Sequence, residues 1–324
     1  MKVNTGQQPT LDLSVIIPLF NEEESMPELC EWISRVVKGM GVSHEILFVD
    51  DGSQDKSWEV IEVLWEQYPV VKAFRFGRNY GKSAALDMGF SHCQGRVVIT
   101  MDADLQDSPD EIPKLFEMID KQGFHMVSGW KQKRYDPISK TIPSKLFNKV
   151  TSIFSGIKLH DFNCGLKAYQ FKVVKSIHLY GEMHRYIPVI SSQNGFGKIG
   201  EMVVEHRARK YGKTKFGLER FIYGFLDLLS ISFVSKFKKR PMHFFGSLGT
   251  LSFMVGFFIT LYLIFEKNYN IRHHLRVRDV VDQPLFFLAL VAIVIGVQLF
   301  LAGFLGEILA NQNRKEEYII TDTI

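Results

Sequence analysis

Two long stretches without a charged residue lie near the C-terminal end of the 324-residue chain. They cover residues 244–265 and 284–306, and Phe, Leu, Ile and Val dominate both. Each is close to the roughly 20 residues that a helix needs to cross the hydrocarbon core of a bilayer. The small residues of the first stretch, which suit close helix packing in lipid, are Gly246, Ser247, Gly249, Ser252 and Gly256. The sequence therefore predicts a transmembrane hairpin over 241–310, with a pair of buried core helices as the alternative.

Basic residues flank this hairpin and predict its orientation. One cluster lies within 236–240, and Arg314 and Lys315 follow the second stretch. Both fit a cytoplasmic side under the positive-inside rule, although the loop between the stretches also holds basic residues. The polar N-terminus has no signal-peptide pattern. We therefore expect a multi-pass protein of the cytoplasmic (inner) membrane, with residues 1–215 and a tail over 311–324 in the cytoplasm.

Charge and cysteine content exclude some classes of protein. The net charge of +4 is mild and does not indicate nucleic-acid binding. Cys30, Cys93 and Cys164 are scattered without metal-ligand spacing. We interpret them as free thiols in a reducing compartment.

The first half of the chain alternates apolar runs with helical patterns. The predicted strands cover residues 13–20, 45–49, 71–76 and 96–101. The predicted helices cover residues 25–37, 56–66, 82–93 and 109–121. This alternation predicts an α/β fold with a mostly parallel sheet and helices on both faces. Functional loops are expected at the carboxyl ends of its strands.

The pattern is less regular towards the hairpin. Residues 199–205 are expected to form an edge strand. Residues 216–240 are predicted to form an amphipathic juxtamembrane helix, because apolar patches alternate with charged residues over 216–237. A helix in the membrane interface and an ordinary surface helix on the sheet fit this pattern equally well.

Two carboxylates one residue apart follow the fourth predicted strand, in VITMDADLQD (98–107). We expect Asp102 and Asp104 to leave the strand end pointing the same way, because strand side chains alternate between faces. With Gln106 beside them, they suit Mg²⁺ or Mn²⁺ with open positions for a phosphate-bearing substrate. A solvated acidic turn is the alternative for this motif on its own.

A glycine-containing segment, GRNYGKS (77–83), is similar to a phosphate-binding loop. It has three residues between its glycines where that motif needs four, so an ATPase is disfavoured. Lys82 is placed at a helix start, where it either reaches a phosphate or is a solvated surface lysine.

Several segments in a fixed order resemble the motif series of family 2 glycosyltransferases. Within that family, the chain most resembles membrane-anchored polyprenyl-phosphate sugar transferases of the dolichol-phosphate mannose synthase type. The resemblance covers nearly the whole chain, including both apolar stretches. The segments that carry it are PLFNEEESMPEL (18–29), FVDDGSQDKS (48–57), RNYGKSAAL (78–86), MDADLQDSP (101–109), DFNCGLKAY (161–169), GEMHRYIP (181–188) and RARKYGKTKF (207–216).

The resemblance implies a nucleotide-sugar-binding domain of the GT-A type and a set of site residues. Those expected at the nucleotide sugar are Pro18, Phe20, Glu22, Asp51, Lys82, Asp102, Ala103 and Asp104. Phe20 stands where the family usually has Tyr. Those expected to hold the Mg²⁺ or Mn²⁺ ion are Asp102, Asp104 and Gln106.

The resemblance also implies residues for the acceptor and for catalysis. Those expected at the acceptor or its phosphate are Arg134, Arg185, Arg209, Thr214 and Lys215. Ser is commoner in the family than Thr at the position of Thr214. Asp161 matches the proposed catalytic carboxylate. A lipid phosphate is mostly a dianion at neutral pH, since its second pKa is about 6, so it needs little deprotonation. Asp161 is therefore either a base or a group that orients the acceptor, binds through the metal, or organises Lys167 and Arg185.

The function expected from these observations is inverting transfer of a sugar from a nucleotide donor to polyprenyl (undecaprenyl) phosphate at the cytoplasmic membrane face. A uridine diphosphate sugar is favoured as donor over guanosine diphosphate mannose. A processive polysaccharide synthase and a non-enzymatic membrane scaffold are the rival readings. A homo-oligomer is compatible with the resemblance.

Overall fold

The computed structural model describes residues 8–132, 138–208, 210–211 and 241–312. These residues belong to two compact units, one that ends by residue 211 and one that begins at residue 241. The predicted juxtamembrane helix over 216–240 lies outside the described residues, as does the tail after residue 312.

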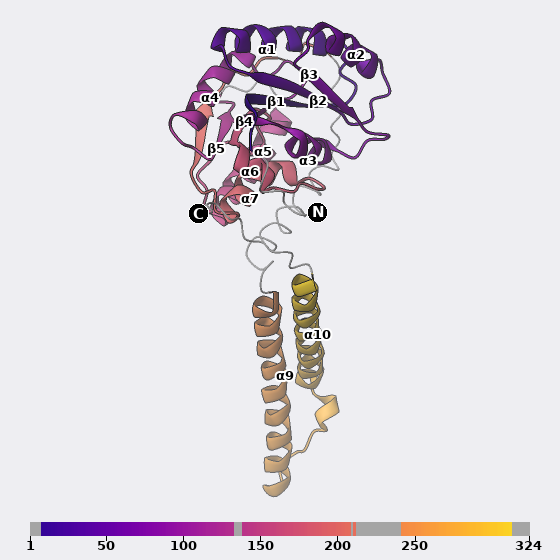
Figure 1. The fold of residues 1–324 in the computed structure, drawn as a ribbon. Coiled ribbons are helices and arrows are strands. Elements are labelled where there is room, and N and C mark those ends of the chain that lie inside the picture. The colour runs from indigo at the N-terminus through magenta and orange to yellow at the C-terminus, as the bar shows by residue number, and fades with distance from the viewer. Residues whose placement is uncertain (1–7, 133–137, 209, 212–240, 313–324) are drawn as a thin grey trace. The chain divides into compact units, whose positions relative to one another are not determined.

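A seven-stranded sheet forms the centre of the first unit, in the order β3-β2-β1-β4-β6-β5-β7 (Figure 1). Its first four strands are mutually parallel: β1 (Leu11–Leu19), β2 (His44–Asp50), β3 (Val71–Arg75) and β4 (Gly95–Thr100). The others are β5 (Met126–Trp130), β6 (Lys167–Gln170) and β7 (Ile199–Val203). β6 runs antiparallel to β4 and β5, whereas β7 pairs parallel with β5 at the sheet edge. The predicted mostly parallel α/β fold is confirmed.

Helices cover both faces of this sheet and bury two apolar cores. α1 (Met26–Met40), α2 (Ser57–Gln67) and α4 (Ile112–Asp120) pack on one face, around Val15 and Ile17. α3 (Lys82–His92) and α6 (Phe171–Lys175) pack on the other face, around Ile16 and Val49. The described residues of this unit also form α5 (Ile138–Ser155), α7 (Ile187–Gln193) and the 3₁₀ turns η1 (Pro109–Glu111) and η2 (Met183–Tyr186). Apolar residues on both faces of β1 explain its near-continuous hydrophobic run.

The order of the strands determines where a ligand would bind. From β1 the chain builds outward through β2 and β3, and then returns to place β4 on the other side of β1. The carboxyl ends of β1 and β4 therefore flank a topological switch point, where open α/β sheets bind ligands. Asp102 and Asp104 follow β4 at this point.

The predicted end of the fourth strand, at residue 101, lies one residue beyond the observed end. β4 ends at Thr100, and the residues from Asp102 to Gln106 form a turn in which Leu105 has a φ of 59°. The alternation of strand side chains therefore does not set the directions of Asp102 and Asp104. The turn sets them instead.

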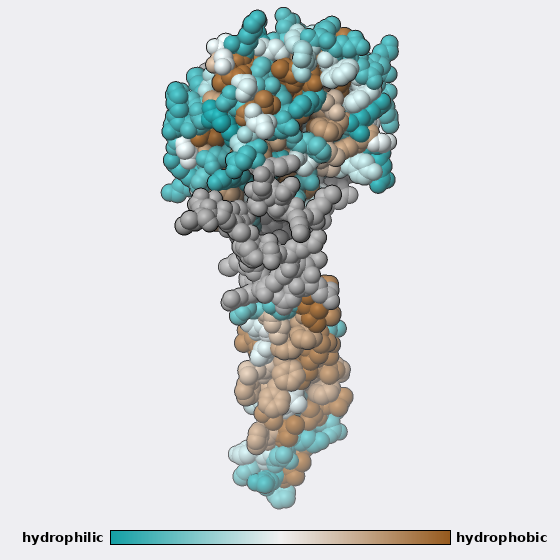
Figure 2. Space-filling model, viewed as in Figure 1, coloured by the Kyte–Doolittle hydropathy of each residue, from teal (hydrophilic) through white to brown (hydrophobic). Residues whose placement is uncertain are grey.

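The second unit contains two long apolar helices, α9 (Pro241–Arg272) and α10 (Pro284–Gln312), with η3 (Val280–Asp282) in their connection. The most apolar segments of α9 and α10 have mean hydropathies of 2.1 and 2.8. Only 17% of the first segment and 11% of the second is buried. Figure 2 shows this unit's surface as brown along the helices and teal around the connecting loop. Such exposure disfavours a pair of buried core helices. Both helices are long and apolar enough to cross a membrane.

Glycines let the two helices approach closely. A Cβ on Gly256 would lie 2.6 Å from the carbonyl oxygen of Ala289, and one on Gly249 would lie 2.7 Å from that of Gly296. The hydroxyl of Ser252 donates a hydrogen bond of 2.8 Å to the carbonyl of Ala292. Small residues and interhelical hydrogen bonds are the means by which helices associate in lipid. The predicted packing role of the small residues in α9 therefore agrees with the structure.

Candidate active site

Asp102 begins the acidic turn (102–106), and its carboxylate rests against the backbone of Gly165. A Cβ on Gly165 would lie 2.5 Å from Cγ of Asp102, so only glycine leaves room for this side chain. The segment before β6 reaches this position because β6 runs antiparallel to β4. The first residue of β6, Lys167, pairs with Thr100, the last residue of β4.

Lys82 forms an ion pair with Asp102 through Nζ and Oδ1. Lys82 is the first residue of α3, and the loop before this helix is held by Asp51. The buried Asp51 carboxylate accepts hydrogen bonds from the backbone N–H of Tyr80, at 2.7 Å, and of Gly81, at 2.9 Å. Burial raises the pKa of Asp51 against the effect of these two donors. Asp51 therefore orders the loop that brings Lys82 to the acidic turn.

Further lysines surround the same carboxylate. Burial alone would raise the pKa of Asp102, but the positive charges of Lys82 and Lys131 outweigh it and hold the pKa at about 2. Lys131 itself forms an ion pair of 2.8 Å with the buried Asp107. Burial opposes the charge on Lys131, yet Asp107 raises its pKa. Asp102 is thus an anion at neutral pH, with several lysines around it.

Asp104 and Gln106 form the outer part of the turn. Oδ1 of Asp104 accepts a hydrogen bond of 3.2 Å from the backbone N–H of Gln106. The side-chain amide of Gln106 donates to the carbonyl of Arg207 at 3.4 Å, and the N–H of Arg207 donates to the carbonyl of Gln106 at 2.9 Å. The turn is thereby tied to the segment that follows β7. The role of Gln106 as a metal ligand stays a prediction.

The donor set of the turn fits a hard divalent cation in part. Asp102 and Asp104 offer carboxylate oxygens, which Mg²⁺ and Mn²⁺ prefer. Within the described ranges, no group of three or more His, Cys, Asp or Glu side chains is placed to enclose an ion. One or two carboxylates completed by substrate phosphates and water is the usual way in which Mg²⁺ is bound beside a nucleotide. The residues therefore fit an ion that binds together with a diphosphate.

Asp161 is buried, with 1% of its surface exposed, and begins the segment that contains Gly165. Its carbonyl accepts a hydrogen bond of 3.1 Å from the hydroxyl of Ser128, and its Oδ1 accepts one of 3.0 Å from the N–H of Asn163. Glu201 on β7 holds the backbone here. Its Oε1 accepts the N–H groups of His160, at 2.7 Å, and of Asp161, at 3.0 Å. The Asp161 side chain thus stands on a fixed turn.

β6 and η2 contribute two basic side chains and a histidine to this part of the unit. Lys167 is buried and donates to the carbonyl of Cys164, and burial lowers its pKa. Arg185, also buried, pairs with Glu182 at 3.1 Å. Burial and the neighbouring cations lower the pKa of His184 well below its ordinary value. His184 is therefore an uncharged imidazole at neutral pH.

Three of the residues expected at the nucleotide lie at the carboxyl end of β1. Pro18 is buried within the strand, while Phe20 and Glu22 follow it and are half-buried. The segment that follows β1 is tied to the segment that follows β2, because the backbone N–H of Asn21 donates a hydrogen bond of 2.8 Å to the hydroxyl of Ser53. The buried Ala103 lies in the acidic turn that follows the adjacent strand, β4.

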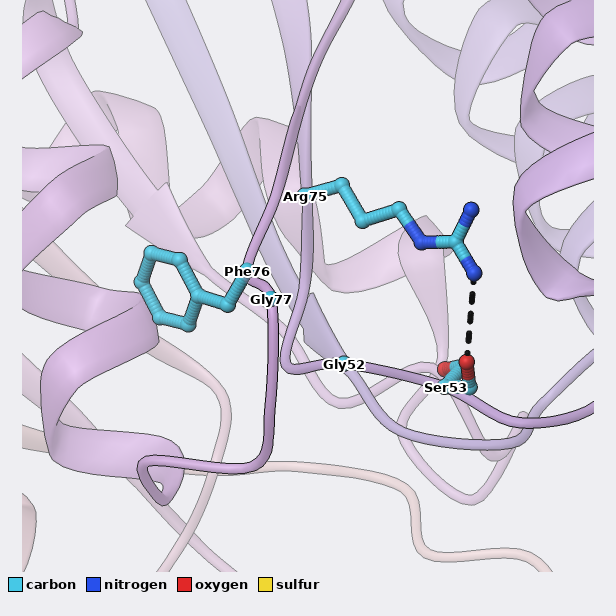
Figure 3. Close-up of a pocket in the computed structure, with 5 residues that line it drawn as sticks. All are labelled: Gly52, Ser53, Arg75, Phe76 and Gly77. Atoms are coloured by element: carbon cyan, nitrogen blue, oxygen red, sulfur yellow. Dashed lines mark hydrogen bonds between the residues drawn. The ribbon is translucent and has the colours of Figure 1, made fainter.

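A cavity of about 290 Å³ opens where β2 and β3 end. Gly52, Ser53, Arg75, Phe76 and Gly77 line it. Figure 3 shows the side chains of Arg75 and Phe76 pointing in opposite directions, with Arg75 hydrogen-bonded to the carbonyl of Ser53 at 3.3 Å. Gly52, which lines the cavity, directly follows Asp51 in the sequence. The cavity therefore lies beside the region expected to receive the nucleotide.

Four of the residues expected at the acceptor cannot be placed. Arg134, Arg209, Thr214 and Lys215 lie outside the described residues. Lys131, Gly165 and Glu201 were not among the predicted site residues. The position of Lys131 directly after β5 was an available signal, since functional side chains gather at strand ends. A glutamate in an edge strand, such as Glu201, carries no comparable signal.

Residues 14–177 match the model of glycosyl transferase family 2. The chain belongs to this family. It is 33% identical over 311 residues to a dodecaprenyl-phosphate galacturonate synthase of Rhizobium johnstonii, which covers 95% of this chain and 90% of the relative. It is 32% identical over 325 residues to an undecaprenyl-phosphate 4-deoxy-4-formamido-L-arabinose transferase of Shewanella sediminis, covering 96% and 92%. The predicted resemblance to polyprenyl-phosphate sugar transferases is confirmed.

A solved structure supports the fold of this family 2 enzyme. The glucosyl-3-phosphoglycerate synthase of Mycobacterium tuberculosis, in complex with Mn²⁺, uridine diphosphate and glucosyl-3-phosphoglycerate, superposes with a TM-score of 0.53. The match covers 70% of this chain and 80% of that chain, at 16% sequence identity. The expected GT-A-type fold is confirmed.

Proposed function

We propose that this protein transfers a sugar, with inversion, from a nucleoside diphosphate sugar to a polyprenyl phosphate at the cytoplasmic face of the inner membrane. The observation that carries the proposal is the meeting of Asp102, Lys82 and the segment after Asp161 at the switch point of a family 2 domain. The named relatives act on dodecaprenyl and undecaprenyl phosphates, and the two apolar helices suit a lipid acceptor. A uridine diphosphate sugar is the proposed donor.

The proposed reaction exchanges one phosphate ester of the sugar for another. An oxygen of the lipid phosphate forms a bond to the anomeric carbon as the bond to the nucleoside diphosphate breaks. The diphosphate leaves with the electron pair and needs positive charge around it. Lys82 supplies one cation, and the half-buried carboxylates Asp102 and Asp104 would hold Mg²⁺ or Mn²⁺, whose charge stabilises the leaving group. Asp161 and Lys167 are proposed to position the acceptor.

A transfer assay with the full-length chain in detergent tests this proposal. Undecaprenyl phosphate, Mn²⁺ and a panel of uridine diphosphate sugars, including galacturonate and 4-deoxy-4-formamido-L-arabinose, are expected to give a lipid carrying one sugar and one equivalent of uridine diphosphate. Mass spectrometry of the lipid product measures the number of sugars. A long saccharide would identify a processive synthase, and no turnover with any donor, guanosine diphosphate mannose included, would support the scaffold.

The pH dependence of the transfer rate distinguishes the two proposed roles of Asp161, an orienting carboxylate and a general base. The lipid phosphate is already mostly dianionic above about pH 6, so an orienting carboxylate has no proton to remove. We expect the rate defect of Asp161→Asn to stay constant between about pH 7 and pH 9. The measurement is the transfer rate of variant and parent at saturating donor and metal. A defect that shrinks steadily as pH rises would instead identify Asp161 as a general base.

A further inference from the structure

The ion pair between Lys82 and Asp102 occupies the carboxylate that the divalent ion would need. Nζ of Lys82 contacts Oδ1 of Asp102 directly. The two side chains are 32% and 31% exposed, so each is accessible from solvent and neither is locked in the core. A cation that approaches Asp102 must therefore share or displace the lysine.

The other lysines near Asp102 are held differently. Lys131 is 13% exposed and paired with Asp107. Lys167 is buried and donates to the carbonyl of Cys164. These two are fixed parts of the site. Lys82, by contrast, is at the start of α3 with a long side chain that extends from a half-exposed position. It is the lysine best placed to change partner.

A nucleoside diphosphate offers Lys82 such a partner. The backbone of the preceding loop is anchored on Asp51, so the base of the Lys82 side chain stays in place while its ammonium group turns. Ser83 is also fixed, because its hydroxyl accepts a hydrogen bond of 3.0 Å from the N–H of His184. Phosphate oxygens carry more negative charge than one carboxylate, and lysine binds them as a point charge.

We propose that Lys82 and the divalent ion compete for Asp102, and that an arriving nucleoside diphosphate transfers Lys82 from Asp102 to its phosphate oxygens. This inference rests on the proposed function, since it needs the metal and donor site described above. Without nucleotide, the ion binds weakly because Lys82 holds its ligand. With nucleotide, Asp102 is released to the ion. The ion and the nucleotide therefore strengthen each other's binding by the same factor, as thermodynamic linkage requires.

The test is Mn²⁺ binding to the full-length chain in detergent, with and without uridine diphosphate. The electron paramagnetic resonance signal of free Mn²⁺ gives the dissociation constant, after correction for the complex that Mn²⁺ forms with the nucleotide alone. For the parent, we expect uridine diphosphate to tighten Mn²⁺ binding by at least about tenfold. For Lys82→Met, we expect Mn²⁺ alone to bind about tenfold more tightly and the nucleotide effect to shrink by a similar factor.

Lys121→Met is the matched control. Lys121 also pairs with a carboxylate, that of Glu117 at 3.2 Å, and both side chains are exposed at the end of α4. The substitution therefore removes one positive charge without a change in the site. This variant should bind Mn²⁺ as the parent does. In an Asp102→Asn background, Lys82→Met should no longer tighten Mn²⁺ binding, because the contested ligand is gone.

The outcomes separate the inference from the function on which it rests. An equal gain of Mn²⁺ affinity in Lys82→Met with and without nucleotide means simple charge repulsion, and overturns the exchange of partners. No gain of Mn²⁺ affinity in Lys82→Met without nucleotide overturns it as well. If the parent binds no Mn²⁺ even with uridine diphosphate, the metal site itself is refuted, and with it the inference.

Discussion

Asp104→Asn is expected to lower the transfer rate by two orders of magnitude or more while the fold survives. The carboxylate lies in the turn after β4 and is half-buried beside Asp102. An amide in its place keeps the shape but removes one of two anionic ligands from the proposed ion. Metal stabilisation of a leaving group contributes several kcal/mol, and about 1.4 kcal/mol corresponds to tenfold in rate. The fold should tolerate the change because the carboxylate is not in the apolar core.

The measurement is the rate of lipid-linked sugar formation at moderate and at high Mn²⁺ concentration. Part of the lost rate should return at high Mn²⁺, since a weakened site fills by mass action. Glu117→Gln is the control, because it also removes one carboxylate charge but lies exposed on α4. A rate near that of the parent at moderate Mn²⁺ would exclude Asp104 as a ligand.

The strands and helices were predictable because their patterns are local. An apolar run such as 13–20 has few alternatives to a strand buried on both faces, and β1 covers Leu11–Leu19. The end of β4 was placed one residue too late, because Met101 is apolar and buried although it lies outside the strand. Burial alone therefore does not show where a strand's hydrogen bonding stops.

The site residues were predictable only where they belong to a recognisable sequence motif. The pairing of Lys82 with Asp102 joins two segments that are close only after folding, and no periodicity reports it. The same holds for Glu201, which reaches Asp161 because β7 pairs with β5 at the sheet edge. Asp51 was expected at the nucleotide. Its hydrogen bonds with the backbone of Tyr80 and Gly81 show that it also holds the loop before α3, a role that the spacing of residues in the sequence does not indicate.

Gly165→Ala is expected to lower turnover about a hundredfold, although the substitution replaces no side chain that contacts substrate. A Cβ at this position would lie 2.5 Å from Cγ and 2.8 Å from Oδ1 of Asp102. The backbone here has little freedom to retreat. The carbonyl of Gly165 accepts the hydroxyl of Thr100 at 2.9 Å, and the next carbonyl, of Leu166, accepts the N–H of Gly129 at 2.9 Å. The side chain of Asp102 must therefore move, and a shift of about 1 Å at a reacting centre costs roughly this much.

Mn²⁺ affinity in the presence of uridine diphosphate, measured together with the transfer rate, distinguishes this displacement from general damage. We expect both to fall in Gly165→Ala, while the melting temperature drops only modestly, since one extra methyl group in a packed region typically costs about 1–3 kcal/mol. Gly197→Ala is the matched control, because a Cβ there meets no atom within 4 Å. Parent-like Mn²⁺ binding and turnover in Gly165→Ala would mean that the carboxylate of Asp102 does not need its present position. The proposed ion would then have to be held by Asp104 and the diphosphate.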